Sequence, residues 1–234
     1  MTDAGRWRPN PPPRSEAELM EHAHAMAGES LSALAEGQGL TSPTESRRAK
    51  GWAGQLIEAY LGASAGSLSE PDFQLIGVEL KTIPVNADGE PRESTYVTTV
   101  PLMGESSTRW EDSNVHRKLA RVLWVPIVVA SVSDDGTEPG QRIIGSPLLW
   151  SPSPEEGSAL AADWRELMDM VCLGELESIT AHHGTCLQIR PKAADSRARR
   201  WGIGESGEEV RTLPRGFYLR PSFTRAILRK HYAL

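Results

Sequence analysis

The sequence predicts an α/β protein in which helices and strands alternate along the chain and build a mixed β-sheet. One observation is the helical spacing of apolar residues in several segments, as at Trp52, Leu56 and Tyr60. Another is an apolar period of two, as at Val78 and Leu80, which is typical of a strand. Segments of both kinds are intermixed rather than gathered in separate halves, and this favours an α/β class with a mixed sheet.

The first part of the chain is expected to be helical and then extended. Ser15, with Glu18 three residues later, has the spacing of a helix N-cap, and Gly28 follows the last turn. The expected helices cover residues 15–28, 31–37 and 51–62. Strands are expected at 77–85 and 94–102, and the Asp-Gly turn between them predicts that these two strands pair with each other.

The remainder of the chain is expected to alternate in the same way. The longest helix should cover 153–174, since Ser153 and Pro154 mark its start and Gly174 follows its end. A hairpin within 180–193 should turn near Gly184. The other expected elements are a helix at 113–120, strands at 121–130, 142–150 and 211–220, a polar loop at 195–209 and a terminal helix at 221–232.

The chain is expected to form a flexible arm followed by one folded domain. Residues 1–14 are polar and rich in proline, as disordered arms are. Residues 15–234 are long enough to bury a core as a single domain with two lobes, which we place at about 15–101 and 102–234. The N-terminus lacks the apolar stretch of a signal peptide, and no apolar run is long enough to span a bilayer. A soluble, cytoplasmic protein without a membrane partner is therefore expected.

The distribution of charge favours a polyanionic partner, although the chain as a whole is acidic. The formal net charge is −6. From Thr180 to the C-terminus, eleven lysines and arginines stand against four acids, so that this segment carries +7 and the rest of the chain −13. Such asymmetry indicates a basic surface for a nucleic acid on one lobe. A solvated cationic face would have the same composition.

The stretch EPDFQLIGVELKTIP, residues 70–84, places three charges within a run of core-forming residues. On a strand, Glu79 and Lys81 share one face, and Asp72 lies one short turn upstream. Two carboxylates that converge there would suit Mg²⁺, which lowers the pKa of a bound water, and a lysine beside them can stabilise charge on a phosphorane. The pattern predicts phosphodiester hydrolysis, but an exposed, solvated strand face has the same spacing.

Two neighbouring features strengthen the prediction of a nuclease. Pro71 precedes Asp72, which completes the pattern Pro-Asp…Glu-x-Lys. Glu58 interrupts the apolar pattern of the helix expected at 51–62 and could reach the same acids. A metal site formed by histidines or cysteines is not indicated, because these residues lack further ligands at suitable spacing.

More specific information comes from longer blocks of the sequence, which are KGWAGQLIEAYLGASAGS, GVELKTIPV, RKLARVLWVP, GSPLLWSP, DWRELMDMV, LQIRPKAA and TLPRGFYL. These blocks, in this order, resemble the MutH family of DNA mismatch-repair endonucleases, which is part of the restriction-endonuclease-like PD-(D/E)xK group. The resemblance runs from about Ser15 to Leu228, nearly the whole chain. It implies a restriction-endonuclease-like fold with two lobes around a DNA-binding cleft.

The resemblance implies a set of catalytic residues in this chain. It places the catalytic acids and lysine on Asp72, Glu79 and Lys81. Glu58 would be an additional acid, so that the metal ligands for Mg²⁺ would be Asp72, Glu79 and Glu58. Lys118, in HRKLARVLW, matches a further lysine of the active site.

The resemblance also implies contacts with double-stranded DNA from the strand at QIRPKAA. Arg190 and Lys192 share one face there, and Pro191 indicates an edge strand or the end of a strand. Arg190 suits a bidentate contact with guanine, and Lys192 suits a phosphate or a base acceptor.

Further DNA contacts are expected from a lysine and two tyrosines. Lys50 would meet a phosphate, although on its own it has the character of an ordinary solvated lysine. Tyr218 would lie against the adenine edge and sense an N6-methyl group, although the same residue suits a core strand. Tyr96 stands where the family has an aromatic residue near the DNA.

The family implies an activity and partners. Its members nick one strand beside GATC when that strand lacks adenine methylation, use Mg²⁺, and are activated by MutL after MutS has found a mismatch. The chain has no Gly-x-x-x-x-Gly-Lys-Ser/Thr loop, so ATP-dependence would enter through a partner. One catalytic motif per chain favours nicking by a monomer. The alternatives are a GATC-specific restriction endonuclease that makes double-strand breaks and an inactive DNA-binding module, which the intact Asp72, Glu79 and Lys81 disfavour.

Overall fold

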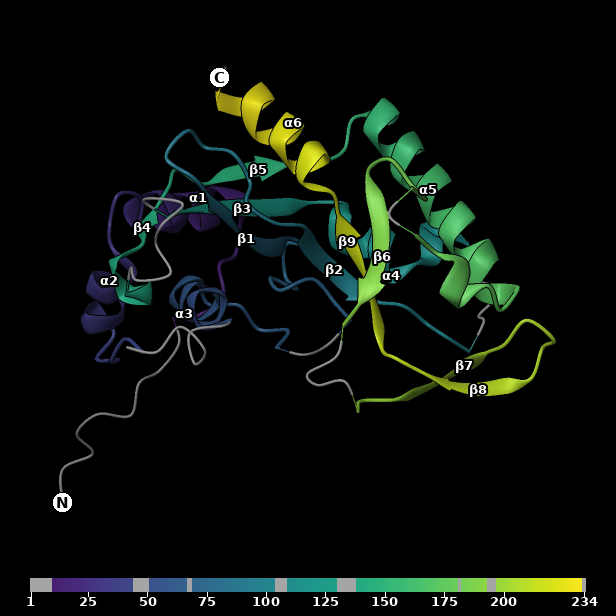
Figure 1. The fold of residues 1–234 in the computed structure, drawn as a ribbon. Coiled ribbons are helices and arrows are strands. Elements are labelled where there is room, and N and C mark those ends of the chain that lie inside the picture. The colour runs from purple at the N-terminus through teal and green to yellow at the C-terminus, as the bar shows by residue number, and fades with distance from the viewer. Residues whose placement is uncertain are drawn as a thin grey trace. The chain divides into compact units, whose positions relative to one another are not determined.

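The structure is a computed structural model that describes residues 10–43, 51–66, 69–103, 109–129, 138–180, 182–192 and 197–232 (Figure 1). The chain forms two compact units. Unit 1 contains Met1–Arg92 and Arg121–Trp150, and unit 2 contains Glu93–Ala120 and Ser151–Leu234. This division differs from a single boundary near residue 101, because the chain passes from one unit to the other three times.

The helices of unit 1 are α1 (Glu16–Ala25), α2 (Leu31–Gly37) and α3 (Trp52–Leu61). Ser15 caps α1, since its hydroxyl accepts the Glu18 N–H at 3.1 Å. The Glu18 carboxylate accepts the N–H of Arg14 rather than that of Ser15. Helix α3 ends at Gly62, whose φ of 77° is in the left-handed region, and a Cβ there would collide with the main chain of Pro11.

The sheet of unit 1 is mixed and is built around β3 (Val122–Val128). Strand β1 (Glu79–Val85) pairs with β3 in parallel, with Lys81 opposite Trp124. Strands β4 (Ile143–Ile144) and β5 (Leu148–Trp150) pair with β3 in the antiparallel direction, and a 3-10 turn, η2 (Pro139–Gln141), precedes β4. Main-chain hydrogen bonds to β3 therefore hold β1 in place along the whole strand.

Unit 1 has a continuous apolar core between α3 and the sheet. Leu56 and Ile57 of α3 pack in one cluster with Val78, Leu80 and Leu123, and all five side chains are buried. Burial of each such side chain contributes about 1.5–3 kcal/mol. The core therefore fixes the strand on which the catalytic motif was predicted.

The sheet of unit 2 is antiparallel, with β9 (Arg215–Leu219) between β2 (Thr95–Thr99) and β6 (Leu187–Pro191). A separate hairpin consists of β7 (Arg200–Ile203) and β8 (Glu209–Thr212). The helices of this unit are α4 (Asn114–Leu119), α5 (Pro154–Cys172) and α6 (Pro221–Tyr232), with 3-10 turns η1 (Trp110–Asp112) and η3 (Leu176–Ser178). Helix α5 begins with a full capping box of Ser153 and Glu156.

Mixed α/β architecture is confirmed, but several details of the expected topology are wrong. Strand 94–102 does not pair with 77–85, because β2 joins β9 in another sheet. The expected loop at 195–209 contains β7 and the start of β8. The strand expected at 142–150 is interrupted between β4 and β5, the one at 211–220 is interrupted around Pro214, and a single strand, β6, follows Gly184. Within the described residues, no helix combines the length and apolarity needed to cross a membrane.

Candidate active site

Glu79 and Lys81 form a buried ion pair on β1. Glu79 is only 2 % exposed, and the Lys81 side chain is 12 % exposed. The Lys81 ammonium lies 2.5 Å from Oε1 of Glu79, so the two side chains share one face of the strand as their spacing predicts. This burial excludes a solvated strand face. Because a buried charge is costly unless it is paired, the pair indicates a site rather than an incidental surface.

Asp72 is brought to the start of β1 by a tight turn. Phe73 and Val78 exchange main-chain hydrogen bonds across this turn. The Asp72 carboxylate, in a residue that is 9 % exposed, accepts the main-chain N–H of Leu80 at 2.8 Å. The acid is therefore fixed to the residue that follows Glu79.

Glu58 lies on the side of α3 that faces β1. A Cβ built on Gly54 would lie 3.9 Å from Oε1 of Glu58 and 3.8 Å from Oγ1 of Thr82. Thr82 follows Lys81 directly, so its side chain projects from the opposite face of β1. Among the residues that the structure describes, no three His, Cys, Asp or Glu side chains form a group that could hold a metal. The three acids Asp72, Glu79 and Glu58 are thus not assembled as one ligand set here.

The two further lysines expected near the site have different positions. Lys118 lies in the last turn of α4, within unit 2, and is 9 % exposed. Lys50 lies outside the described residues. The catalytic role of Lys118 and the phosphate contact of Lys50 remain predictions from the family.

Four residues predicted to contact DNA lie together on the sheet of unit 2. Tyr96 of β2 and Tyr218 of β9 are register partners, and their ring centroids lie 5.4 Å apart in an edge-to-face arrangement. The Lys192 ammonium lies 2.9 Å from the centroid of the Tyr96 ring, and the Arg190 guanidinium lies 5.9 Å from that of Tyr218. Arg190 also donates to Oγ of Ser94 at 3.1 Å. The sheet therefore presents two cations on an aromatic pair.

The position of β6 suits exposure of its basic residues. It is an edge strand of this sheet and ends at Pro191, as the proline predicts. Arg190 and Lys192 are both exposed. Burial raises the pKa of Tyr218, with a smaller increase from Tyr96, which favours the protonated hydroxyl further.

Gly216 is a residue of this cluster that sequence reasoning missed. A Cβ at Gly216 would lie 2.9 Å from Cε2 of Tyr96 and 3.1 Å from Cε2 of Tyr218. A side chain there would force the rings apart. A glycine inside an expected strand is the signal that could have indicated this close approach.

Asp163 is a second residue that sequence reasoning missed. It is 5 % exposed within α5, and its carboxylate accepts the N–H groups of Thr185 at 2.9 Å, Cys186 at 2.6 Å and Leu187 at 2.8 Å. One acid thereby fixes the segment that leads into β6. The sequence could have indicated this role, because Asp163 stands on the apolar face of the helix expected at 153–174, and a buried acid requires hydrogen-bond partners.

Comparisons with known proteins identify the family. The family model described as "DNA mismatch repair enzyme MutH" matches residues 61–163. A protein named "DNA mismatch repair protein MutH" from Serratia proteamaculans is 53 % identical over 222 residues, which are 95 % of this chain and 96 % of that protein. The chain belongs to the MutH family. Proteins of the same name from Salmonella paratyphi C and Salmonella heidelberg are 53 % and 52 % identical over 223 residues, with 95 % of each chain covered. The assignment as a DNA endonuclease of the MutH family is thus confirmed.

Proposed function

We propose that this endonuclease nicks the unmethylated strand of hemimethylated or unmethylated GATC sites, depends on Mg²⁺, and is activated by MutL after MutS has recognised a mismatch. The observation that carries the catalytic part is the buried Glu79–Lys81 pair next to Asp72 on β1. Membership of the MutH family supports the part in methyl-directed repair. We also propose that the enzyme is monomeric and cytoplasmic.

The acids of unit 1 fit a magnesium site that is completed by the substrate. Mg²⁺ is usually held by one or two carboxylates together with waters and phosphate oxygens, so a set of three protein acids is not required. Asp72 and Glu79 would be the ligands, with Glu58 as an additional acid on α3. When bound, the metal would supply Lewis acidity and lower the pKa of a water molecule.

Lys81 has two roles in this proposal. In the structure its ammonium compensates the buried charge of Glu79 at 2.5 Å. Near a scissile phosphate, the same ammonium would orient the attacking water and stabilise the negative charge that develops on the phosphorane. Because both side chains are mounted on a strand that is paired with β3, they are held in place before the substrate binds.

Unit 2 would supply recognition of the site. Arg190 would donate two hydrogen bonds to a guanine, and Lys192 would contact a phosphate or a base acceptor. Tyr218 would lie against the adenine and detect an N6-methyl group, with Tyr96 as its aromatic neighbour. Apart from this surface, Lys50 of unit 1 would contact a phosphate, and Lys118 would be a further lysine of the active site.

A plasmid assay tests the proposal. Supercoiled plasmids with GATC sites in each methylation state are incubated with the protein and Mg²⁺, with and without MutL. Open-circular product from unmethylated and hemimethylated DNA alone, enhanced by MutL, is expected. Linear DNA as the first product would support a restriction endonuclease instead, and intact plasmid under every condition would support an inactive DNA-binding module.

A further inference from the structure

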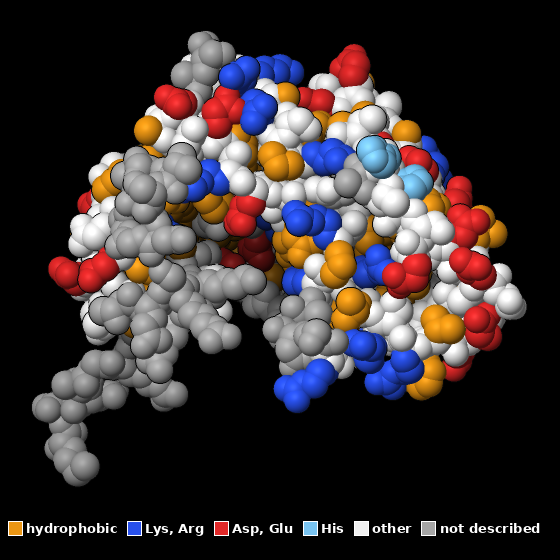
Figure 2. Space-filling view, in the orientation of Figure 1, with side chains coloured by type: hydrophobic (Ala, Val, Ile, Leu, Met, Phe, Trp, Pro, Cys, Tyr) orange, Lys and Arg blue, Asp and Glu red, His pale blue; other side chains and the backbone are white. Residues whose placement is uncertain are grey.

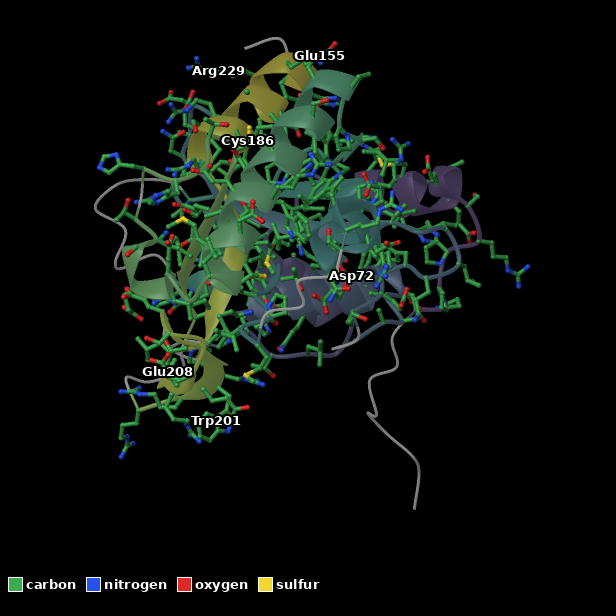
Figure 3. All side chains as sticks on the ribbon, turned by 90° about the vertical axis from the view of Figure 1, so that its right-hand side faces the viewer. Asp72, Glu155, Cys186, Trp201, Glu208 and Arg229 are labelled. Carbon is green, nitrogen blue, oxygen red and sulfur yellow. The ribbon has the colours of Figure 1, made fainter. Side chains whose placement is uncertain are left out.

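The open end of the β7–β8 hairpin exposes an aromatic ring together with arginines. We call this region, formed by Arg200, Trp201 and Arg211, the hairpin base. Trp201 is 51 % exposed at the outer edge of unit 2 (Figure 3). Arg211 is its register partner, and the guanidinium lies 4.9 Å from the centroid of the Trp201 ring. Stacking orders the arginine while its in-plane N–H groups remain able to bind an anion.

Charge is separated along the hairpin. The acids Glu205, Glu208 and Glu209 lie at or beside its turn, where the Glu208 carboxylate accepts the N–H of Ser206 at 3.0 Å. The arginines lie at the opposite end, where Arg200 faces Thr212 across the two strands. The hairpin base is therefore positive, which is the property that a polyanion requires and a neutral or basic partner does not.

No acid of the described chain forms an ion pair with the hairpin base, although Glu177 lies beside it, where it accepts a hydrogen bond from Thr212, the register partner of Arg200. Arg215 is a useful contrast, because its guanidinium is paired with Glu177 at 2.6 Å. Neither Arg200 nor Arg211 forms an ion pair within the part of the chain that the structure describes. The two exposed guanidinium groups can therefore bind an external phosphate without first breaking an internal ion pair.

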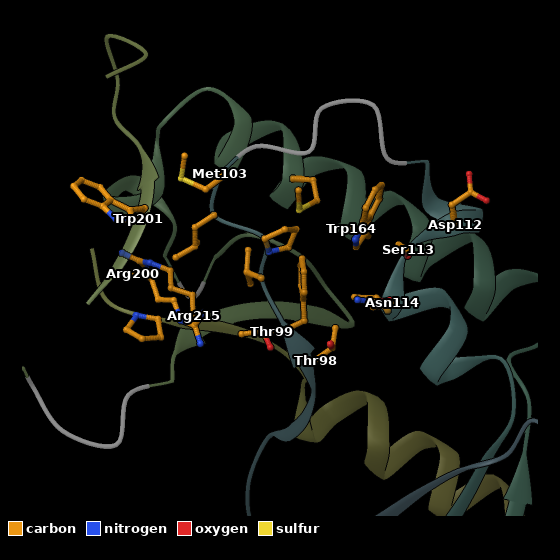
Figure 4. A pocket seen from close by; sticks show the side chains of 17 residues that line it. Thr98, Thr99, Met103, Asp112, Ser113, Asn114, Trp164, Arg200, Trp201 and Arg215 are labelled. Carbon is orange, nitrogen blue, oxygen red and sulfur yellow. The ribbon is translucent and has the colours of Figure 1, made fainter. Parts of the chain in front are cut away.

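A pocket of about 400 Å³ begins beside the hairpin base (Figure 4). Arg200 and Trp201 line one end of it near Met103, whereas Trp164 and Asp112 lie at the other end. The guanidinium of Arg215, which also lines the pocket, is already paired with Glu177. An anion is therefore favoured at the hairpin base itself rather than inside the pocket.

The hairpin base is close to the end of β6, where Lys192 follows the strand. The N–H of Lys192 donates to the carbonyl of Pro214 at 2.7 Å. Arg211 lies three residues before Pro214, so their Cα atoms are at most about 11 Å apart. The step from Pro214 to its hydrogen-bonded partner Lys192 adds about 5.5 Å. The Cα atoms of Arg211 and Lys192 are therefore at most about 16 Å apart, which corresponds to roughly five base pairs of duplex at a rise of about 3.4 Å per base pair. Lys and Arg side chains gather over β6 and over this end of the hairpin on the face shown in Figure 2.

We propose that the hairpin base is a second DNA-contact surface, at which Arg200 and Arg211 bind the sugar-phosphate backbone of duplex DNA flanking the recognised sequence and Trp201 holds Arg211 in position. The contact would read no base, because phosphates carry no direct sequence information. This proposal rests on the proposed function, because it assumes that Lys192 contacts the same duplex.

Salt dependence of binding on two duplexes tests this proposal. One duplex carries about ten base pairs, roughly one helical turn, on each side of GATC, and the other carries about two. Binding is measured without divalent metal between 50 and 200 mM salt. On the long duplex, the magnitude of the slope of log K against log salt should be smaller by about two for the Arg200→Ala/Arg211→Ala variant than for the wild type. Over the fourfold rise in salt, the affinity of the wild type should therefore fall by a factor about ten times larger than the affinity of the variant. On the short duplex, which ends about two base pairs from GATC, the difference between the two proteins should be smaller than on the long duplex.

Control variants separate this contact from a general loss of charge. Arg165→Ala/Arg225→Ala removes the same charge from exposed positions on α5 and α6 and should retain the slope of the wild type. Arg200→Lys/Arg211→Lys should retain most of the slope, and Trp201→Ala should lose part of it with both arginines present. Equal slopes for the wild type and the double alanine variant would overturn the proposal, as would an equal decrease for the control pair.

The test of the flanking contact and the test of the proposed GATC specificity can fail separately. If the long-duplex effect is present but the wild type shows no preference for GATC, the proposed function fails and the flanking contact stands. If the GATC preference is present and the slopes are equal, only the flanking contact fails.

Discussion

The carboxylate of Asp72 accepts the main-chain N–H of Leu80 at 2.8 Å, which ties the first acid of the motif to the strand that carries the second acid and the lysine. Asp72→Asn keeps an oxygen that can accept this hydrogen bond but removes the charge. We expect cleavage to fall by at least about 100-fold with little change in stability, because metal affinity depends on the carboxylate.

Asp72→Ala is the matched comparison for this prediction. It leaves the buried N–H of Leu80 without its acceptor and should cost about 1–3 kcal/mol in the free energy of unfolding. Chemical denaturation and the plasmid assay measure the two effects. A wild-type cleavage rate in the Asn variant would show that Asp72 is not a metal ligand.

Lys81→Ala should abolish nicking while DNA binding stays nearly intact. It should also destabilise unit 1, because loss of a partner from a buried ion pair costs about 3–5 kcal/mol. A double variant, Glu79→Gln/Lys81→Met, removes both charges and should recover much of the stability without any recovery of cleavage. Comparable losses of binding and cleavage in folded Lys81→Ala would mean that Lys81 binds DNA rather than acts in catalysis.

Asp163→Ala should destabilise the segment that enters β6. Three N–H groups, those of Thr185, Cys186 and Leu187, lose a shared acceptor, and the expected cost is on the order of 3 kcal/mol. Asp163→Asn retains one acceptor oxygen and should cost less. Hydrogen exchange at these amides, together with thermal unfolding, checks the prediction, which fails if their protection is unchanged in the Ala variant.

Arg190→Ala should weaken discrimination at one base pair of the site by about 1–3 kcal/mol if the arginine contacts guanine in a bidentate manner. Arg190→Lys keeps the charge but loses the planar fork, so it should recover general affinity without recovering specificity. The measurement is the ratio of cleavage at GATC to cleavage at sites with one altered base pair. An unchanged ratio in Arg190→Ala would assign the residue to the phosphates.

The ion pair between Glu16 and Arg121 should make stability depend on acid pH. A side-chain hydrogen bond from Arg121 lowers the pKa of Glu16 below its ordinary value of 4.5. The stabilisation is therefore present above that value and is lost as the pH falls through the lowered pKa. Glu16→Gln should reduce the melting temperature at neutral pH, and the difference should vanish in strong acid. Glu21→Gln, at an exposed position of the same helix, should have a smaller effect at neutral pH.

Local features of this protein were predictable because local chemistry determines them. Ser15, Gly62 and Ser153 mark helix ends through caps that involve only nearby residues. The shared face of Glu79 and Lys81 follows from the period of a strand. The pairing of β2 with β9 could not be predicted in this way, because a period of two identifies a strand but not its partner.

The candidate site shows the same limit. The spacing of Asp72, Glu79 and Lys81 suggested a catalytic motif but did not reveal that Glu79 is buried, which depends on the packing of α3 and the pairing with β3. The hairpin of β7 and β8 was missed because four-residue strands with glycines and charges lack an apolar pattern.

The parallel pairing of β1 with β3 has a consequence for biosynthesis of the enzyme. Lys81 lies opposite Trp124, so the position that pairs with Lys81 is translated 43 residues after it. At about 5–20 residues per second, a nascent chain would carry the complete motif for several seconds before the strand could be paired. A truncated product ending near Arg92 would hold Asp72, Glu79 and Lys81 without β3. Nuclease activity is thereby expected only in chains whose synthesis has passed β3, and products that end before β3 are expected to lack it.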